Sequence, residues 1–203
     1  MRATRLLLIR HGHTTGNLGG GTVVLGSTDL PLTVQGIHQA RRIARNLGPW
    51  PFDAIYSSPL QRAAATAREI QVVHRVPLQW CPGLQEIHCG AADGLEVRVA
   101  EHRFPAAWEI NDREEHADFR WPGGESYADL RRRVLAACDR IAAEHRGGSA
   151  VVVTHAGVVN QLLGAIQNLC PARWRPFRPS HCTVTEVDWQ EGTGRLVRFD
   201  VSL

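Results

Sequence analysis

A short group of chemically capable side chains follows the first apolar run of the chain. Arg10, His11 and Gly12 come directly after Leu6–Ile9. A guanidinium and an imidazole beside a residue without a side chain suit the handling of a phosphoryl group, because phosphoryl transfer depends on positioning and on neutralising oxygen charge. A second apolar run ends in the same way, and its residues are Ala150–Val153 followed by Thr154-His155-Ala156-Gly157. Open α/β sheets bind ligands outside the carboxyl ends of their strands, so both histidines are candidates for one site.

Two further side chains complete a reaction scheme. Arg62 opens a predicted helix after a short serine–proline turn, and a helix N-terminus favours anions. Arg10, Arg62 and a protonated His155 would bind the phosphoryl oxygens. Neutral His11 would attack phosphorus with one ring nitrogen while a backbone acceptor holds the other. Glu86, in a loop after the third predicted strand, is the candidate acid that protonates the leaving alkoxide and later takes a proton from water.

Each of these residues also has a structural interpretation. A histidine at a strand end is more often a hydrogen-bonding residue than a catalyst, and Arg62 in a first helical turn would ordinarily lie on the surface. Glu86 alone would be an ordinary loop carboxylate. The catalytic interpretation is favoured for His11 and His155 because glycine lies close to each of them, where a backbone must approach a ligand.

Strands and helices alternate along the chain, which predicts a three-layer α/β/α sandwich on a mostly parallel sheet. Strands are expected at 5–9, 53–56, 77–81 and 150–154, with a closing antiparallel hairpin at 182–189 and 196–201. Four helices are expected. The first is capped by Thr33 and ended by Gly48, the second begins with a capping box of Ser58 and Gln61, the third is capped by Ser126, and the fourth covers 158–169. The segment 83–124, with short helical stretches at 96–104 and 105–111, is expected to be an excursion that roofs the site. The whole chain, 1–203, is expected to form a single domain.

Composition limits the classes of function. No apolar stretch approaches the ~20 residues that cross a bilayer, so we expect a cytoplasmic protein without a membrane partner. All 23 basic residues are arginine, which excludes a P-loop lysine, a kinase strand lysine and a lysine Schiff base. The net charge of +3 is too balanced to predict a nucleic-acid partner, and the basic run Arg131–Arg133 is interpreted as a solvated helix face. The five cysteines form no C-x-x-C pair and are expected to be reduced, mostly buried thiols.

Several blocks of the sequence, in order, resemble the histidine phosphatase (phosphoglycerate-mutase-like) superfamily. They are Arg10-His11-Gly12-His13-Thr14 with Asn17, Asp29-Leu30-Pro31-Leu32-Thr33 before Gly36, Ser57-Ser58-Pro59-Leu60 with Arg62, Ala63 and Thr66, and Thr154-His155-Ala156-Gly157. The resemblance implies that His11 forms a phosphohistidine and that Glu86 is the proton donor. It implies that Arg10, Asn17, Arg62 and His155 bind the phosphate. It also implies that neither a metal ion nor an organic cofactor is needed.

The chain departs from the family pattern at two places. His13 stands where the family commonly has Glu or Gln, and Ala91-Ala92-Asp93 precedes Gly94 where a bulky or acidic pair is common. A metal pair of His11 and His13 is conceivable but lacks a third ligand of suitable spacing. His13, Thr14 and His181 are the candidate substrate contacts.

The expected function is therefore that of a metal-independent phosphomonoester hydrolase acting on a small phosphorylated metabolite. A cofactor-dependent phosphoglycerate mutase is the first alternative, and the absence of lysine for a substrate carboxylate argues against it. A catalytically silent phosphate-binding module and a nucleic-acid-binding protein are the others, and a homodimer is left open beside a monomer. Arg98, Arg103, Arg113 and Arg120, with Trp108 and Trp121, are interpreted either as substrate contacts or, by default, as a solvated face with packing aromatics.

Overall fold

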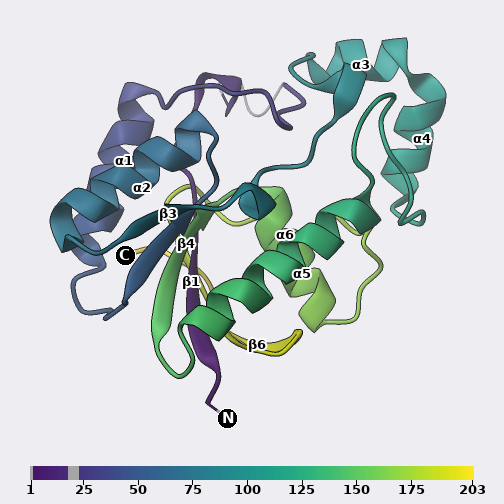
Figure 1. The fold of residues 1–203 in the computed structure, drawn as a ribbon. Coiled ribbons are helices and arrows are strands. Elements are labelled where there is room, and N and C mark those ends of the chain that lie inside the picture. The colour runs from purple at the N-terminus through teal and green to yellow at the C-terminus, as the bar shows by residue number, and fades with distance from the viewer. Residues whose placement is uncertain (1, 18–22) are drawn as a thin grey trace.

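The computed structural model describes residues 2–17 and 23–203, whose core is one six-stranded sheet (Figure 1). The strand order is β3-β2-β4-β1-β5-β6. The strands are β1 Thr4–Arg10, β2 Ala54–Ser57, β3 Leu78–Trp80, β4 Ser149–Thr154, β5 Val184–Gln190 and β6 Thr193–Val201. The first four in spatial order are parallel, whereas β5 runs antiparallel to β1 and β6 antiparallel to β5. The predicted mostly parallel sheet with a closing hairpin is confirmed.

Helices cover both faces of this sheet. The helices are α1 Val34–Asn46, α2 Gln61–His74, α3 Val97–Arg103, α4 Pro105–Arg113, α5 Tyr127–Glu144 and α6 Ala156–Ile166. Alternate residues of β1 point to opposite faces, so Leu7 and Ile9 pack with α1 and α2 while Leu6 and Leu8 pack with α5 and α6. Figure 1 shows α1 and α2 on one side of the sheet and α5 and α6 on the other, which is the predicted three-layer arrangement.

Two of the predicted helix caps are present and one is wrong. Thr33 accepts a hydrogen bond from the backbone N–H of Gly36, and Ser126 accepts one from Asp129, so α1 and α5 begin as predicted. The predicted capping box of Ser58 and Gln61 does not form. Ser58 stays with the sheet edge, because its N–H donates to the carbonyl of Val153, and the side chain of Gln61 bonds Asp29 instead.

Strand register brings the two histidine-bearing segments together. Arg10 pairs with Thr154 in the parallel β1–β4 ladder, and the N–H of His11 donates to the Thr154 carbonyl at 2.9 Å. His11 and His155 are the next residues along their chains, so both leave the sheet at the same edge. Ser58 reaches this edge through the end of β2.

The segment between β3 and α5 leaves the sandwich and carries its own small core. It contains short 3-10 turns at Pro82–Leu84 and Gly90–Ala92, followed by α3 and α4, which project beyond the sheet in Figure 1. Cys89, Ala92 and Trp121 form a hydrophobic cluster separate from the two that cover the sheet. All five cysteines are free, and all but Cys170 are buried, as predicted. Within the ranges described, no helix has the length and apolar character needed to cross a membrane.

Close backbone contact at Gly36 predicts a measurable stability cost for a side chain there. A Cβ on Gly36 would lie 2.1 Å from the carbonyl oxygen of His13, whereas one on Gly48 would meet nothing closer than 3.6 Å. Gly36→Ala should therefore lower the free energy of unfolding by about 1–3 kcal/mol, because backbone must move. Urea unfolding of both variants measures this, with Gly48→Ala expected to match the parent. A Gly36→Ala protein as stable as the parent would contradict the contact.

Candidate active site

His11 is a buried, neutral imidazole whose two ring nitrogens have different partners. Its Nδ1 lies 2.8 Å from the carbonyl oxygen of Gly12, and its Nε2 lies 3.2 Å from Nε of Arg62. A carbonyl can only accept and a guanidinium can only donate, so the proton is on Nδ1 and the lone pair is on Nε2. Burial, followed by the charges of Arg62 and Arg10, holds the pKa of His11 well below its ordinary value. The ring is thus held in the form that can act as a nucleophile.

Arg62 joins the two histidines from the first turn of α2. It is 0% exposed, and its Nε donates to His11 Nε2 and to His155 Nδ1, each at 3.2 Å. Its terminal nitrogens donate to the carbonyls of Thr28 at 2.7 Å and Gly26 at 2.9 Å. Burial lowers the pKa of Arg62, yet arginine stays charged in proteins, so a buried positive charge lies between the two rings.

Arg10 supplies a second positive charge beside the first. Its Nη1 donates to the carbonyl of Pro179 at 2.8 Å, and its buried Nε has no hydrogen-bond partner among the residues that the structure describes. Within the described chain, neither Arg10 nor Arg62 forms an ion pair with a carboxylate. Glu86 is the acidic residue that acts most strongly on the pKa of both. Two guanidiniums without a directly bound carboxylate make this place attractive to an anion.

His155 is fully buried and neutral, whereas the phosphate-binding role inferred from the sequence depends on a protonated ring. Its Nε2 lies 2.8 Å from Ser58 Oγ, and its Nδ1 accepts from Arg62. Burial, and next the charge of Arg62, lowers its pKa well below the ordinary value. Ser58 was predicted only as a helix cap, and here it orients a site histidine.

Glu86 lies against the N-terminus of α6. Its two carboxyl oxygens accept from the N–H groups of Ile87 and Gly157, each at 3.0 Å. A Cβ on Gly157 would lie 2.2 Å from Glu86 Oε1, so only glycine at 157 lets the carboxyl approach the helix. The glycine that the sequence placed near His155 therefore makes room for Glu86.

Arg133 holds the segment that carries Glu86. Its guanidinium donates to the carbonyls of Gly83, Gln85 and Glu86 at 3.0, 2.7 and 3.1 Å. The same group binds both oxygens of Glu125, at 2.7 and 2.9 Å. The interpretation of the basic run as a solvated face is wrong for this residue and for Arg131, which donates to Gln161 and Leu169; only Arg132 points into solvent.

The remaining predicted residues surround the entrance. His13 and His181 have ring centroids 5.7 Å apart, and His181 lies 5.4 Å from His11 and donates from Nδ1 to the His11 carbonyl at 2.8 Å. Asn17 also faces the entrance, with its side-chain oxygen accepting from the hydroxyl of Thr14 at 2.8 Å. Thr14 is fully buried and does not line the pocket.

Asp200 is a further residue that the sequence did not reveal. At the end of β6 it accepts from the N–H of Ser180 at 2.6 Å and from the hydroxyl of Thr183 at 2.6 Å. These bonds anchor the loop whose Pro179 carbonyl binds Arg10 and whose His181 packs beside His11. No local pattern marks this residue, because its partners lie up to 20 positions away.

A large pocket opens above these groups. It has a volume of about 750 Å³, and its lining includes Arg10, His13, Asn17, Glu86 and His181. His11, Arg62 and His155 are buried and are not part of its lining.

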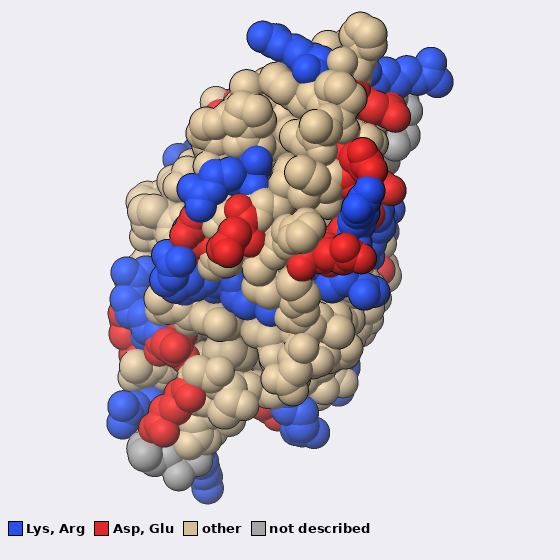
Figure 2. All heavy atoms as spheres, turned by 90° about the vertical axis from the view of Figure 1, so that its right-hand side faces the viewer, with Lys and Arg blue, Asp and Glu red and all other residues tan. Residues whose placement is uncertain are grey.

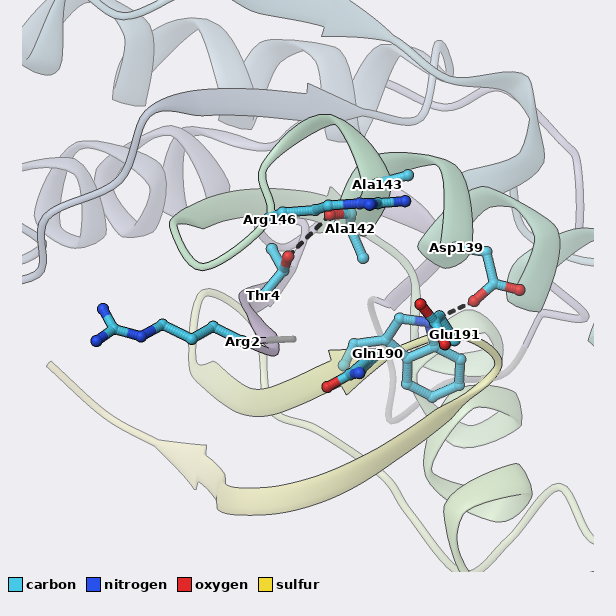
Figure 3. A pocket seen from close by; sticks show the side chains of 9 residues that line it. Arg2, Thr4, Asp139, Ala142, Ala143, Arg146, Gln190 and Glu191 are labelled. Atoms are coloured by element: carbon cyan, nitrogen blue, oxygen red, sulfur yellow. Dashed lines mark hydrogen bonds between the residues drawn. The ribbon is translucent and has the colours of Figure 1, made fainter.

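Figure 3 shows a smaller pocket of about 230 Å³, lined by Thr4 at the start of β1 and by Asp139. Arg10 lies at the other end of β1, so this second pocket is at the opposite end of the strand from Arg10. It contains none of the predicted site residues.

No metal cluster competes with this site in the described structure. No group of three or more His, Cys, Asp or Glu side chains within residues 2–17 and 23–203 is arranged to hold a metal ion. Figure 2 shows acidic and basic side chains interspersed on the face turned toward the viewer. Exposed ion pairs of the described chain include Arg113–Glu109 and Arg132–Asp129.

Comparison with known proteins gives consistent results. The sequence model of the histidine phosphatase superfamily (branch 1) matches residues 6–202. The chain is 35% identical over 162 residues to the metal-independent phosphoserine phosphatase of Arabidopsis thaliana, covering 78% of this chain and 67% of that protein. It is 32% identical over 192 residues to the probable phosphoglycerate mutase GpmB of Yersinia enterocolitica, covering 92% and 86%. The solved structure of Bacillus stearothermophilus YhfR matches with a TM-score of 0.88 at 28% identity, over 99% and 98% of the two chains.

The buried histidines predict that acid destabilises the fold. Burial lowers the pKa of His181 to about 4, whereas the unfolded side chain has an ordinary value of 6.5. Because the folded pKa is the lower one, the unfolded chain binds more protons between these values, and stability present above pH 6.5 is lost as the pH falls. His11 and His155 act in the same direction.

Urea midpoints at about pH 7.5 and about pH 5 test this prediction for the parent and for His181→Asn. The variant loses one hydrogen bond at both pH values but should show a smaller drop between them. An equal drop in the two proteins would contradict the assignment of His181 as a half-buried neutral ring.

Proposed function

The chain belongs to the histidine phosphatase superfamily, and on that premise we propose that it hydrolyses phosphomonoesters through a phosphohistidine on His11 without a metal ion. The observation that carries the proposal is the bond from Arg62 to Nε2 of His11. It places the lone pair of a neutral imidazole beside two buried guanidiniums, which is where a nucleophile for an anionic phosphoryl group has to lie.

The first half of the reaction transfers the phosphoryl group to the protein. Nε2 of His11 attacks phosphorus, and the bond between phosphorus and the ester oxygen breaks. Arg10, Arg62 and the amide of Asn17 bind the phosphoryl oxygens, and Glu86 gives its proton to the departing alkoxide. A phosphoryl dianion offsets the arginine charges that lower the pKa of His155, so the ring of His155 can take up a proton and bind it.

The second half regenerates the enzyme. The carboxylate of Glu86 takes a proton from a water molecule, and that water attacks the phosphorus of phosphohistidine. The bond between phosphorus and Nε2 breaks, which releases inorganic phosphate and returns His11 to the neutral form. The carbonyl of Gly12 holds Nδ1 throughout and keeps Nε2 aimed at phosphorus.

Two other functions can be distinguished from phosphomonoester hydrolysis by experiment: a phosphoglycerate mutase and a catalytically silent binding module. Some relatives are named as phosphoglycerate mutases, but this chain contains no lysine to bind the carboxylate of a phosphoglycerate. A silent binding module would need the arginines and would have no use for the neutral ring of His11 or for Glu86. Both alternatives predict no release of inorganic phosphate that depends on His11.

Hydrolysis of p-nitrophenyl phosphate in the presence of EDTA tests the proposal. The parent should turn over in the chelator, and His11→Ala should lose activity by roughly 10³-fold or more, because no other group replaces the nucleophile. Turnover that survives His11→Ala, or that EDTA abolishes, would refute the mechanism. Conversion of 3-phosphoglycerate to 2-phosphoglycerate with a trace of bisphosphate would instead favour the mutase.

Arg133 offers a test of Glu86 that leaves the carboxyl itself in place. Arg133→Met removes the bonds to three carbonyls of the Glu86 segment, so the acid should be poorly placed. Turnover of an alkyl phosphate, whose leaving group needs a proton, should fall roughly 10- to 100-fold. Turnover of p-nitrophenyl phosphate should fall much less, because p-nitrophenolate leaves without protonation.

Arg132→Met is the matched control, since the side chain of Arg132 is 75% exposed on the same helix and bonds only Asp129. Both substrates should be turned over by it as by the parent. If Arg133→Met slowed both substrates by the same factor, Arg133 would support the fold in general and not the position of Glu86.

A further inference from the structure

The pocket above the phosphate site has a chemical character that narrows the substrate. We propose that it accepts phosphomonoesters whose alcohol part is bulky and aromatic, and that it disfavours small esters carrying a carboxylate. The proposal rests on the proposed phosphatase function and adds to it the class of leaving group.

Size is the first argument. The pocket volume of about 750 Å³ lies in the range of pockets that enclose ligands of drug or nucleoside size. A phosphorylated three-carbon acid would leave most of it filled with water. An alcohol with one or two rings would fill it and displace that water, which is favourable where the walls are apolar.

The walls are aromatic, and they come from two distant parts of the chain. Trp108 lies on α4, whereas Trp174 and Phe177 lie in the segment after α6, and all three are half-buried residues that line the pocket. Trp121 packs against Trp108, with their ring centroids 6.0 Å apart. The indole N–H of Trp174 donates to the Asn111 carbonyl at 3.3 Å, which fixes the plane of its ring. Rigid aromatic faces of this kind stack on a planar group with little loss of entropy.

Three amide side chains in the lining form hydrogen bonds within the wall. The carbonyl oxygen of the Asn111 side chain accepts from the hydroxyl of Tyr127 at 2.7 Å. Asn160 donates to the Arg173 carbonyl and accepts from the N–H of Phe177, at 2.8 and 3.0 Å. Gln161 is held in the same manner, by Arg131 and the Pro171 carbonyl. Both ends of the Asn160 and Gln161 amides are thus engaged with the wall, which makes them poor partners for a small polar substrate, whereas Asn17 belongs to the proposed phosphate site.

Charge in the pocket also disfavours a carboxylate. Glu86 is the acidic residue of the lining, and it would repel a second anionic group near the reacting oxygen. Of the two arginines in the lining, Arg10 belongs to the phosphate site, and Arg178 lies in the exposed rim with its guanidinium 5.5 Å from the ring centroid of Trp174.

A series of primary alkyl phosphates tests the proposal without a large change in the leaving alkoxide. The substrates are ethyl phosphate, 2-phenylethyl phosphate, 2-(1-naphthyl)ethyl phosphate and O-phosphoserine. The value of kcat/KM should rise roughly 10- to 100-fold from the ethyl to the naphthylethyl ester, and O-phosphoserine should not exceed the ethyl ester. Trp174→Ala should shrink the ratio between the naphthylethyl and ethyl esters. Trp80→Ala, which removes a 46% exposed tryptophan on edge strand β3, should leave the ratio unchanged.

Calorimetric titration with 2-(1-naphthyl)ethanol measures binding in the pocket independently of catalysis. The parent and Trp80→Ala should bind this alcohol, and Trp174→Ala should bind it at least several-fold more weakly. Hydrolysis of O-phosphoserine or ethyl phosphate as fast as the naphthylethyl ester would overturn the substrate class while the phosphatase function stands. If no ester were hydrolysed while the alcohol still bound through Trp174, the pocket assignment would stand and the proposed function would fail. Absence of binding by the parent would overturn the pocket assignment.

Discussion

The buried guanidinium of Arg62 is the interaction on which the site depends. It contacts both imidazoles through one N–H group and two loop carbonyls through the others, and no carboxylate neutralises it directly within the described chain. Burying an unpaired charge is costly, and the cost is offset here by hydrogen bonds from all three nitrogens of the group. Burial and this fixed positive centre together lower the pKa of His11 and of His155 and keep both rings neutral. In the proposed mechanism, the same charge both prepares His11 as the nucleophile and attracts the phosphoryl group.

Simple backbone geometry brings this centre to the sheet edge. Parallel pairing of β1 and β4 in the register of Arg10 with Thr154 makes His11 and His155 neighbours, at a ring-centroid distance of 5.1 Å. Close backbone contacts then tighten the arrangement. Gly12 packs against Gly36 at the start of α1, and Gly157 admits the carboxyl of Glu86 to the start of α6. Each glycine is needed because a Cβ would occupy the space of an oxygen atom.

The sequence predicted the parts of this molecule that depend on local pattern. The alternation of apolar runs and capped helices gave the sandwich, and the strand ends gave the location of His11 and His155. It could not reveal Arg133 or Asp200, because their roles are bonds to carbonyls, N–H groups and hydroxyls of loops up to 50 positions away. The false capping box at Ser58 has the same origin, since a contact with β4 outweighed a local preference. Only part of the aromatic wall could be anticipated. Trp108 was a possible substrate contact on sequence grounds, whereas Trp174 was not, because the two line one pocket only where the excursion folds back toward the segment after α6.

Direct detection of the covalent intermediate tests the central claim that His11 is the nucleophile. Rapid quenching of the enzyme during turnover, followed by peptide mass spectrometry under alkaline conditions, measures where the phosphoryl group resides. We expect a phosphoryl group on His11 that forms within one turnover and is lost on acidification, and none in His11→Ala. A phosphoryl group on another residue, or turnover without any protein-bound phosphoryl group, would contradict the account.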